Sequence, residues 1–545
     1  MNETLLVTAD RMWQDLLEAS PILGTFVGDD RFDHLLPDLS ETGRSAEVEL
    51  ARRGIDAVAP IRDDELDADD QVLADLIDAI GTRLLARVEH RVDRLDAANQ
   101  MHGPSTVFGD IVTAQRADTP ERLDRYEARL RAFPVFLAQA TEVVREAIAT
   151  GLVPSAVVAS RTTGQLERLL ATDIADSPAY APLGDDAAGR DRVEAALRDA
   201  VYPAHEAFLE VLRHDLLPVA TATIGLADLP GGEDIYRAEI LGWTSLALEP
   251  GDVHRLGVER LAAIDEERME IASALGFTSP AAAVADRTAA GENTPTSREA
   301  LLAMVEDQVA RSWDAAPASF GVLPPDNCVV RLVEPFREAD APFAYYHPPT
   351  EDGSRPGTYF VNAFELDDRP LHHVAGVTFH EANPGHHFQI SIEQQRTDRP
   401  MLRRFGADLA CGAFAEGWGL YAERLADEMG LYLDAWERLG MLENQGLRAA
   451  RLVTDTGIHA LGWDRERAIR TLVDSGSAQT DAEIEIDRYI AMPAQALCYM
   501  VGMEEILRGR AAAEAAGVAL RDFHDRVLSQ GQLPLPSFRR IFGTA

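Results

Sequence analysis

The most constraining feature of this sequence is a short stretch that should be helical at both ends and broken in the middle. Residues 378–389 read TFHEANPGHHFQ. Apolar residues recur near helical spacing just upstream, so we expect His380 and Glu381 to lie on a helix. Pro384 removes a backbone donor and Gly385 permits unusual dihedral angles. The helix should therefore be interrupted between the first histidine and the pair that follows.

The spacing of the histidines allows a shared metal ion only if that interruption occurs. In an unbroken helix His386 would lie about 240° around the axis from His380, and His387 would lie about 10 Å further along the same face. Imidazoles and a carboxylate suit zinc, whose bonds to them are about 2.0–2.2 Å. We predict a Zn²⁺ site with His380 as one ligand and Glu381 as general base, as in the HExxH helix of metalloproteases. A helix end decorated with polar residues is the alternative.

A third ligand is expected from residues 414–423, which read FAEGWGLYAE. A catalytic zinc uses three protein ligands and keeps one open position. Glu416 stands between apolar and glycine neighbours, where a lone buried carboxylate would be costly without a cation. Glu423 lies seven residues later on the same helical face. It could support the ligands or replace Glu416, although a surface carboxylate is the simpler interpretation of Glu423.

Polar residues also mark the helix that is expected around residues 487–502, which has Pro493 in its first turn. A zinc hydrolase needs donors for the oxyanion of its tetrahedral intermediate, and a tyrosine hydroxyl or an arginine can supply them. The candidates are Tyr499, Tyr489 and Arg488, in that order. A buried tyrosine with a satisfied hydroxyl is the alternative for each tyrosine.

Three short β-rich segments precede the histidine stretch, at residues 328–333, 343–347 and 358–362. Pro, Gly and Asp residues separate them, which is typical of strands joined by turns. We expect a small sheet beside the zinc helix, where an extended substrate could add along an edge strand. Tyr359 and Asn362 are then candidates for substrate binding. The strands could equally serve only to brace the helix.

Most of the remaining sequence predicts helices. From Leu5 to about Pro325, apolar residues recur at intervals of three and four, with capping residues before the segments and Gly or Pro after them. The expected fold is mainly α, with a helical body over residues 1–325 and a catalytic region over residues 326–545. We expect the two parts to form one continuous fold.

Composition excludes several classes of function. The formal net charge of −40 over 545 residues argues against a nucleic-acid partner and against an anionic membrane surface. All 51 basic residues are arginine, so no lysine can form a Schiff base or bind phosphate in a P-loop. The three cysteines are isolated, the N-terminus does not resemble a signal peptide and no apolar run could cross a membrane. These features favour the cytoplasm, and the oligomeric state stays open.

Three groups of residues resemble the signatures of the bacterial domain-of-unknown-function family 885. They are His380-Glu381-x-x-Pro384-Gly385-His386-His387, Glu416-Gly417-Trp418 and Arg488-Tyr489-x-x-x-Pro493-x-Gln495. That family is similar in fold to Taq-type zinc metallocarboxypeptidases and, more distantly, to angiotensin-converting enzyme. The resemblance implies an elongated helical fold with a central cleft, in which zinc cleaves peptides.

The relatives carry H-E-x-G-H, with a glycine directly before the second ligand. Matching Gly385-His386 to that pair implies His386 as the second ligand, with His387 as the alternative. The third ligand that the resemblance implies is Glu416, and Gln495 joins the substrate-binding candidates.

The sequence thus predicts a zinc metallopeptidase-like hydrolase of short peptides, of the carboxypeptidase or dipeptidase type. One alternative is a zinc amidase that acts on a small non-peptide substrate. The other is a non-catalytic binding protein whose metal site is spoiled by the two residues inserted between the histidines.

Overall fold

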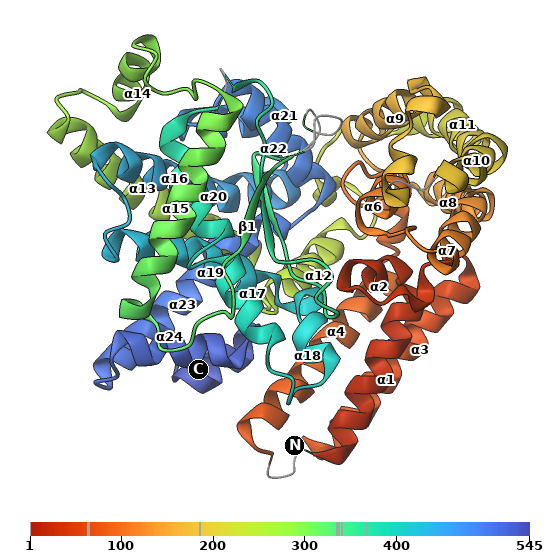
Figure 1. Ribbon diagram of the computed structural model, residues 1–545, viewed down its shortest axis with the longest axis horizontal. Helices are drawn as coiled ribbons and strands as arrows, with labels where there is room; N and C mark the ends of the chain where they lie inside the picture. The colour runs from red at the N-terminus through yellow and green to blue at the C-terminus, as the bar shows by residue number, and fades with distance from the viewer. Residues whose placement is uncertain are drawn as a thin grey trace.

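The computed structural model describes residues 2–62, 66–184, 187–333, 338, 342–366 and 369–544, and the chain is mainly helical, as predicted (Figure 1). The first helices are α1 (Glu3–Ala19), α2 (Pro21–Val27), α3 (Glu41–Val58), α4 (Ala68–Glu89), α5 (Asp93–Asp96), α6 (Val107–Ala114), α7 (Pro120–Arg131), α8 (Phe133–Thr150), α9 (Ala156–Ala171), α10 (Ala187–Ala196) and α11 (Tyr202–Val211). The middle of the chain forms α12 (Gly232–Thr244), α13 (Pro250–Ala274), α14 (Pro280–Ala289) and α15 (Arg298–Ser319). The C-terminal helices are α16 (Leu371–Glu381), α17 (His386–Gln394), α18 (Met401–Phe405), α19 (Asp408–Glu428), α20 (Ala435–Leu461), α21 (Arg465–Asp474), α22 (Gln479–Ala491), α23 (Cys498–Ala515), α24 (Leu520–Gln530) and α25 (Leu535–Phe542).

The predicted small sheet is present and lies directly before α16 in the chain. Its strands are β1 (Val329–Leu332), β2 (Ala344–His347) and β3 (Thr358–Val361), in the spatial order β1-β3-β2. Strand β3 runs parallel to β1, with Val329 opposite Thr358, and antiparallel to β2. Since β3 is central and buried along its whole length, only β1 and β2 offer an edge.

The largest hydrophobic core joins the two ends of the chain. It contains residues of α1, α3 and α4 together with residues of α12, α16, α19, α20, α23 and α25. A second core is built almost entirely from helices α6 to α11, which lie on the right in Figure 1. The main core therefore crosses residue 325, and the early helices α1 to α4 share it with helices of residues 326–545.

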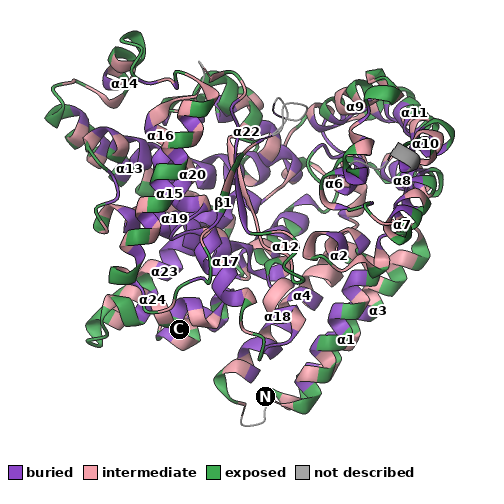
Figure 2. Cartoon of the chain, in the orientation of Figure 1, coloured by how far each residue is buried: buried purple, intermediate pink, exposed green. Residues whose placement is uncertain are grey.

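Helices α19 and α20 form the buried centre of this main core. Figure 2 shows them as predominantly buried, while the outer helices alternate between buried and exposed faces. Helix α20 packs against α13 and α16, and α19 packs against α23. The elements that carry the predicted site are therefore held from several sides.

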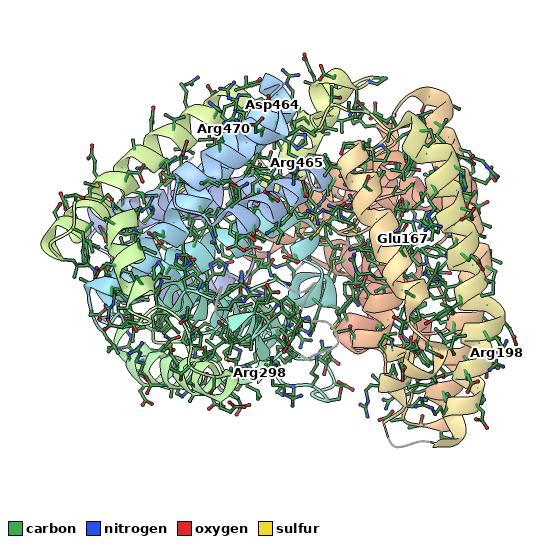
Figure 3. All side chains as sticks on the ribbon, turned by 90° about the horizontal axis from the view of Figure 1, so that it is seen from above. Glu167, Arg198, Arg298, Asp464, Arg465 and Arg470 are labelled. Carbon is green, nitrogen blue, oxygen red and sulfur yellow. The ribbon has the colours of Figure 1, made fainter. Side chains whose placement is uncertain are left out.

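Charged side chains cover the outside of the molecule. Figure 3 shows Glu167, Arg198 and Arg470 on outer helices, and all three are exposed. Many such groups form ion pairs within one helix, as Arg470 does with Glu466 on α21. In the part of the chain that the structure describes, no helix is both long and apolar enough to cross a membrane.

Candidate metal centre

The helix break that the sequence predicts lies between α16 and α17. Helix α16 ends at Glu381, and α17 begins at His386. A side chain at Gly385 would place its Cβ 1.9 Å from the backbone oxygen of His380, so only glycine allows this close approach. The indole Nε1 of Trp418 on α19 donates a hydrogen bond of 2.8 Å to the carbonyl of Pro384. The loop is thus tied to the helix that carries the third predicted ligand.

The break brings three predicted ligands together. The Nε2 atoms of His380 and His386 each lie 3.4 Å from Oε2 of Glu416. The His380 side chain is buried, whereas those of His386 and Glu416 are partly open to solvent. One side of the cluster is therefore accessible.

The two distances to Glu416 match those between ligands of a tetrahedral zinc ion, and all three candidate ligand atoms lie within 4.8 Å of one another. Two ligands bound at about 2.1 Å in a tetrahedron lie about 3.4 Å apart, which matches both distances. Oε2 of Glu416 is buried and makes no hydrogen bond with any described residue, although it faces two imidazole nitrogens. Burial raises the pKa of Glu416, but the two histidines outweigh this and hold it well below its usual value. An anionic oxygen without a hydrogen bond, between two imidazoles, is suited to a cation.

Glu423 orients the first histidine. Its Oε1 lies 2.9 Å from Nδ1 of His380, and its side chain is completely buried. A surface location for Glu423, which seemed the simplest interpretation of the sequence, is therefore wrong. A carboxylate that accepts the Nδ1 proton leaves the lone pair of Nε2 free for a metal, as is usual for metal-binding histidines. Burial lowers the pKa of His380, but the carboxylates of Glu416 and Glu423 raise it to about 9.

His387, the alternative second ligand, points away from this cluster. Its Nε2 lies 2.9 Å from the backbone oxygen of Asp326, and its Nδ1 lies 2.9 Å from the hydroxyl of Tyr346 on β2. Both ring nitrogens are therefore engaged in connecting α17 to the sheet. Of the two adjacent histidines, His386 is the one that lies beside His380 and Glu416.

Glu381 is free to act as a base. It is half-buried and follows His380 at the end of α16. Among the described residues it has no hydrogen-bond or ion-pair partner. A carboxylate without a partner at the edge of a metal cluster can accept a proton from a bound water molecule.

Of the three predicted oxyanion donors, Tyr499 borders the cluster of His380, His386 and Glu416, and Arg488 and Tyr489 lie behind it. The ring of Tyr499 stacks on that of His380 with a centroid distance of 6.0 Å. Arg488 donates to the hydroxyl of Tyr499 at 3.3 Å and to Oε1 of Gln495 at 2.7 Å. Tyr489 is buried, and its hydroxyl lies 2.5 Å from Glu485, so it is a structural tyrosine. Tyr499 is therefore the strongest of the candidates, with Arg488 and Gln495 directly behind it.

The two substrate-binding candidates on and beside β3 do not line an open pocket. Tyr359 is fully buried, with its hydroxyl 3.4 Å from Oγ1 of Thr378 on α16. Asn362 is also fully buried, and its amide donates to the backbone oxygens of Glu338 and Pro342. Tyr359 connects β3 to α16, and Asn362 holds the segment beside the sheet, so the substrate-binding interpretation is corrected for this pair. The β-rich sequence around Tyr359 and Asn362 was equally consistent with the alternative that the strands only brace the helix.

Two glycines of α19 position the site, and the sequence analysis assigned this task to neither of them. A Cβ at Gly419 would lie 2.7 Å from the imidazole of His380, so the ring occupies the space that a side chain would need. A Cβ at Gly417 would lie 2.3 Å from the backbone of Gly502 on α23. This close approach of α19 and α23 brings Glu416 and Tyr499 to one place. The alternating glycines around Trp418 were the available signal.

A second histidine and glutamate cluster lies further back on α16. The Nε2 atoms of His372 and His373 lie 2.7 Å and 2.8 Å from Oε2 of Glu443. Arg268 approaches the other oxygen of Glu443 at 3.6 Å. Direct contacts of hydrogen-bond length leave less room than the 3.4 Å of the first cluster, and a guanidinium group already balances the carboxylate. This cluster is better explained as a buried network that ties α16 to α20.

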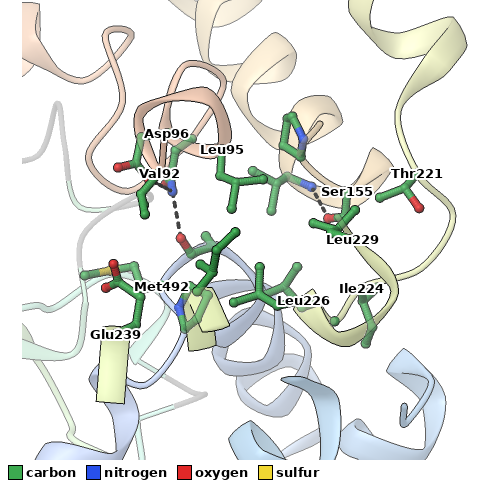
Figure 4. A pocket seen from close by; sticks show the side chains of 18 of the residues that line it. Val92, Leu95, Asp96, Ser155, Thr221, Ile224, Leu226, Leu229, Glu239 and Met492 are labelled. Carbon is green, nitrogen blue, oxygen red and sulfur yellow. Dashed lines mark hydrogen bonds between the residues drawn. The ribbon is translucent and has the colours of Figure 1, made fainter. Parts of the chain in front are cut away.

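A small cavity of about 60 Å³ lies beside the segment that leads to Gln495 (Figure 4). Mostly apolar side chains line it, including Leu95, Leu226 and Met492, and Asp96 stands at its rim. The amide of Asn99 donates to the backbone oxygen of Ala491 at 2.7 Å. The cavity thus lies where the early helices touch the end of α22, away from the metal ligands.

Comparison with known proteins places the whole chain in one group. A family model described as "Bacterial protein of unknown function (DUF885)" matches residues 21–541. The chain is similar to a crystal structure described as a "putative lipoprotein" of Colwellia psychrerythraea, with 26% identity, a TM-score of 0.90 and coverage of 99% of this chain and 98% of the other. It shares its fold with a "putative lipoprotein of unknown function" of Shewanella oneidensis, at 18% identity, a TM-score of 0.76 and 98% coverage of both chains. No curated protein matches it.

Proposed function

Because the chain belongs to the DUF885 family of bacterial proteins of unknown function, its site has to be interpreted from its own geometry, and we propose that it is a zinc-dependent hydrolase of short peptides. The observation that supports this most directly is the pair of 3.4 Å separations between the two imidazoles and Glu416. The proposal includes a relationship in fold to Taq-type metallocarboxypeptidases and, more distantly, to angiotensin-converting enzyme, as the motifs imply. It also includes an action of the carboxypeptidase or dipeptidase type.

Each residue of the site has a defined task in this proposal. His380, His386 and Glu416 would hold the ion, and Glu423 keeps His380 in the tautomer that exposes Nε2. A zinc ion there would lower the pKa of a bound water and polarise the substrate carbonyl. Glu381 would accept a proton from the attacking water and deliver it to the leaving amine as the peptide C–N bond breaks.

Tyr499 stabilises the oxyanion of the tetrahedral intermediate in this proposal. Arg488 donates to the phenolic oxygen, so the hydroxyl proton of Tyr499 is free to point toward the site. A preorganised donor of this kind contributes most where water is excluded. The stacking of the Tyr499 ring on His380 fixes the donor relative to the metal ligands.

Neighbouring histidines provide a matched test of the metal site. We expect protein purified without chelator to contain about one zinc per chain by mass spectrometry. The variant His386→Ala should lose this zinc, because it removes a ligand. The variant His387→Ala should keep it, because that ring only connects α17 to β2 and to Asp326. Equal retention by both variants would show that His386 is no ligand.

The catalytic assignment needs a separate test. The variant Glu381→Gln should keep zinc and lose at least a hundredfold in kcat on a panel of short peptides, since general-base catalysis contributes about 10²–10⁴-fold. Unchanged turnover would overturn the role of Glu381. Turnover of non-peptide amides alone would instead support the amidase alternative, and zinc binding without any turnover would support a binding protein.

A further inference from the structure

We propose that Asp455, a buried carboxylate on α20, positions the oxyanion donor Tyr499 by holding the backbone turn at Ala494 that leads to it. This inference rests on the proposed hydrolase, because the position of Tyr499 affects turnover only if an oxyanion forms. Asp455 acts through the segment between α22 and α23 and not by contact with the substrate. It is therefore a positioning residue for the proposed reaction.

The turn at Ala494 sets the distance between Arg488 and Tyr499. Helix α22 ends just before this turn, and a single 3₁₀ turn over Gln495–Leu497 leads directly into α23. Arg488 lies before the turn, yet it donates to Oε1 of Gln495 at 2.7 Å and to the hydroxyl of Tyr499 at 3.3 Å, which both lie after it. A change in the backbone at Ala494 would therefore move the phenol away from Arg488.

Ala494 has a left-handed backbone conformation, with φ +67° and ψ −13°. The Cβ of an alanine crowds a carbonyl oxygen in this region, so glycine is the residue that adopts it without strain. Pro493, directly before it, has no N–H with which to hold the turn. Strained backbone persists only where its surroundings fix it, so the turn depends on contacts from other elements.

Asp455 supplies the contact to the strained residue itself. Both of its carboxylate oxygens accept from the backbone N–H of Ala494, at 3.2 Å each. The hydroxyl of Tyr236 on α12 donates to Oδ1 of Asp455 at 2.6 Å and thus orients the carboxylate. His459, one turn further along α20, has its Nε2 3.0 Å from the backbone oxygen of Tyr489 on α22. Helix α20 therefore holds the chain on both sides of the turn.

The burial of Asp455 is itself unfavourable. Its side chain is completely buried, and no cation among the described residues pairs with it. Burial raises the pKa of Asp455 to about 7, although the hydrogen bonds from Tyr236 and Ala494 favour the charged form. An apolar residue of similar size would be more favourable at this position if the carboxylate had no task. Its contact with Ala494 gives it one.

Packing holds the turn on one side only. Met492 and Pro493 line the cavity of about 60 Å³ that lies between the turn and the early helices (Figure 4). Side chains at a cavity wall lack the dispersion contacts of a packed core on that side. The hydrogen bonds to Asp455 therefore carry more of the positioning than they would in a closely packed turn.

The test compares turnover of zinc-loaded variants on the best substrate of the short-peptide panel. Asp455→Asn retains the volume but directs an amide N–H toward that of Ala494. It should lower kcat by about tenfold or more and change KM by less than about threefold, because an oxyanion donor acts only in the transition state. Adding Ala494→Gly should restore kcat to within about threefold of the wild type, since glycine adopts the left-handed conformation without strain. Equal kcat values for the single and the double variant would overturn the inference.

Thr454→Val is the matched control. Thr454 is fully buried on the same helix, and its hydroxyl bonds only to backbone oxygens of α20 among the described residues. This variant should leave kcat unchanged, and a loss as large as that of Asp455→Asn would overturn the inference. If Asp455→Asn does not fold, Tyr236→Phe removes only the hydroxyl that orients the carboxylate. It should lower kcat by about threefold or more at unchanged KM, and an unchanged kcat would overturn the inference.

Hydrogen exchange separates this inference from the proposed function, because it requires no turnover. The amides of residues 492–499 should exchange about tenfold faster or more in Asp455→Asn than in the wild type or in Thr454→Val. Faster exchange in a protein that hydrolyses no peptide would retain Asp455 as the anchor of the turn and overturn the hydrolase. Hydrolysis by the wild type with an unchanged kcat in Asp455→Asn would retain the hydrolase and overturn the inference.

Discussion

The buried carboxylate of Glu423 should tune the affinity of the metal site without being a ligand. Its Oε1 lies 2.9 Å from Nδ1 of His380, on the opposite side of the ring from Glu416. The variant Glu423→Gln retains the volume and an acceptor oxygen, so His380 should keep its tautomer. The variant loses the negative charge of Glu423. That charge makes the imidazole of His380 a more basic ligand, so the variant should bind a metal more weakly.

The expected magnitude follows from this geometry. Loss of an outer carboxylate partner typically weakens metal binding about 10–100-fold, or about 1.4–2.7 kcal/mol. Because glutamine preserves the hydrogen bond, we expect Glu423→Gln to weaken zinc binding by about tenfold. Glu423→Ala also removes the acceptor and should approach a hundredfold. The side chain is fully buried, so salt should screen the effect very little.

Competition against a chromophoric zinc chelator measures this affinity directly. The matched control is Glu428→Gln on the same helix, because Glu428 is 46% exposed and pairs with Arg510 at 2.8 Å. The control should bind zinc as the wild type does. If Glu423→Gln and Glu428→Gln have the same zinc affinity, then Glu423 does not act through His380 and the reasoning fails.

Further predictions concern acid stability and the glycine beside His380. Burial lowers the pKa of His205 to about 4, whereas the ordinary pKa of a histidine is near 6.5. At a pH below 6.5, this histidine therefore takes up a proton when the protein unfolds. Folding stability should fall as pH drops from 6.5 toward 4, and His205→Phe should reduce the loss between pH 7 and pH 5 by about 2 kcal/mol in urea unfolding. His214→Phe changes an exposed histidine and should leave this loss of stability unchanged. An identical pH dependence for both variants would contradict the burial of His205 as the cause. Gly419→Ala places a Cβ 2.7 Å from the His380 ring and should weaken zinc binding more than tenfold in the chelator assay. A Cβ at Gly109 would have no atom within 4 Å, so Gly109→Ala should leave zinc binding intact. Equal zinc affinities of Gly419→Ala and Gly109→Ala would refute the steric argument.

The predicted helix break and small sheet are confirmed, whereas the sheet order was not predictable. Pro384 and Gly385 act through local dihedral angles, so their effect on α16 can be derived from neighbours in sequence. The three strands follow from β-rich segments between turns. Their order β1-β3-β2 depends on a parallel crossover between β1 and β3, and single-strand patterns carry no information about it.

The residues that support the site were less predictable than the residues that form it. His380, His386 and Glu416 stand out because of their chemistry and their apolar or glycine context. Glu423 was named as a possible support for the ligands, but its burial was not expected, since an acidic chain offers many glutamates and burial is decided by helix packing. Asp455 on α20 was also missed, because nothing in its local sequence indicates that the turn between α22 and α23 brings the amide of Ala494 next to it.

The two residues inserted between the histidines move the predicted second ligand, His386, without separating it from His380 and Glu416. In an unbroken helix His386 would point about 240° away from His380. In this chain α16 ends first, and His386 is the first residue of α17, so the two rings meet at 90° with centroids 4.7 Å apart. Both Nε2 atoms then face the same oxygen of Glu416. The two inserted residues therefore do not disperse the three predicted ligands, although such dispersal was the reason, drawn from the sequence, for considering a non-catalytic binding protein.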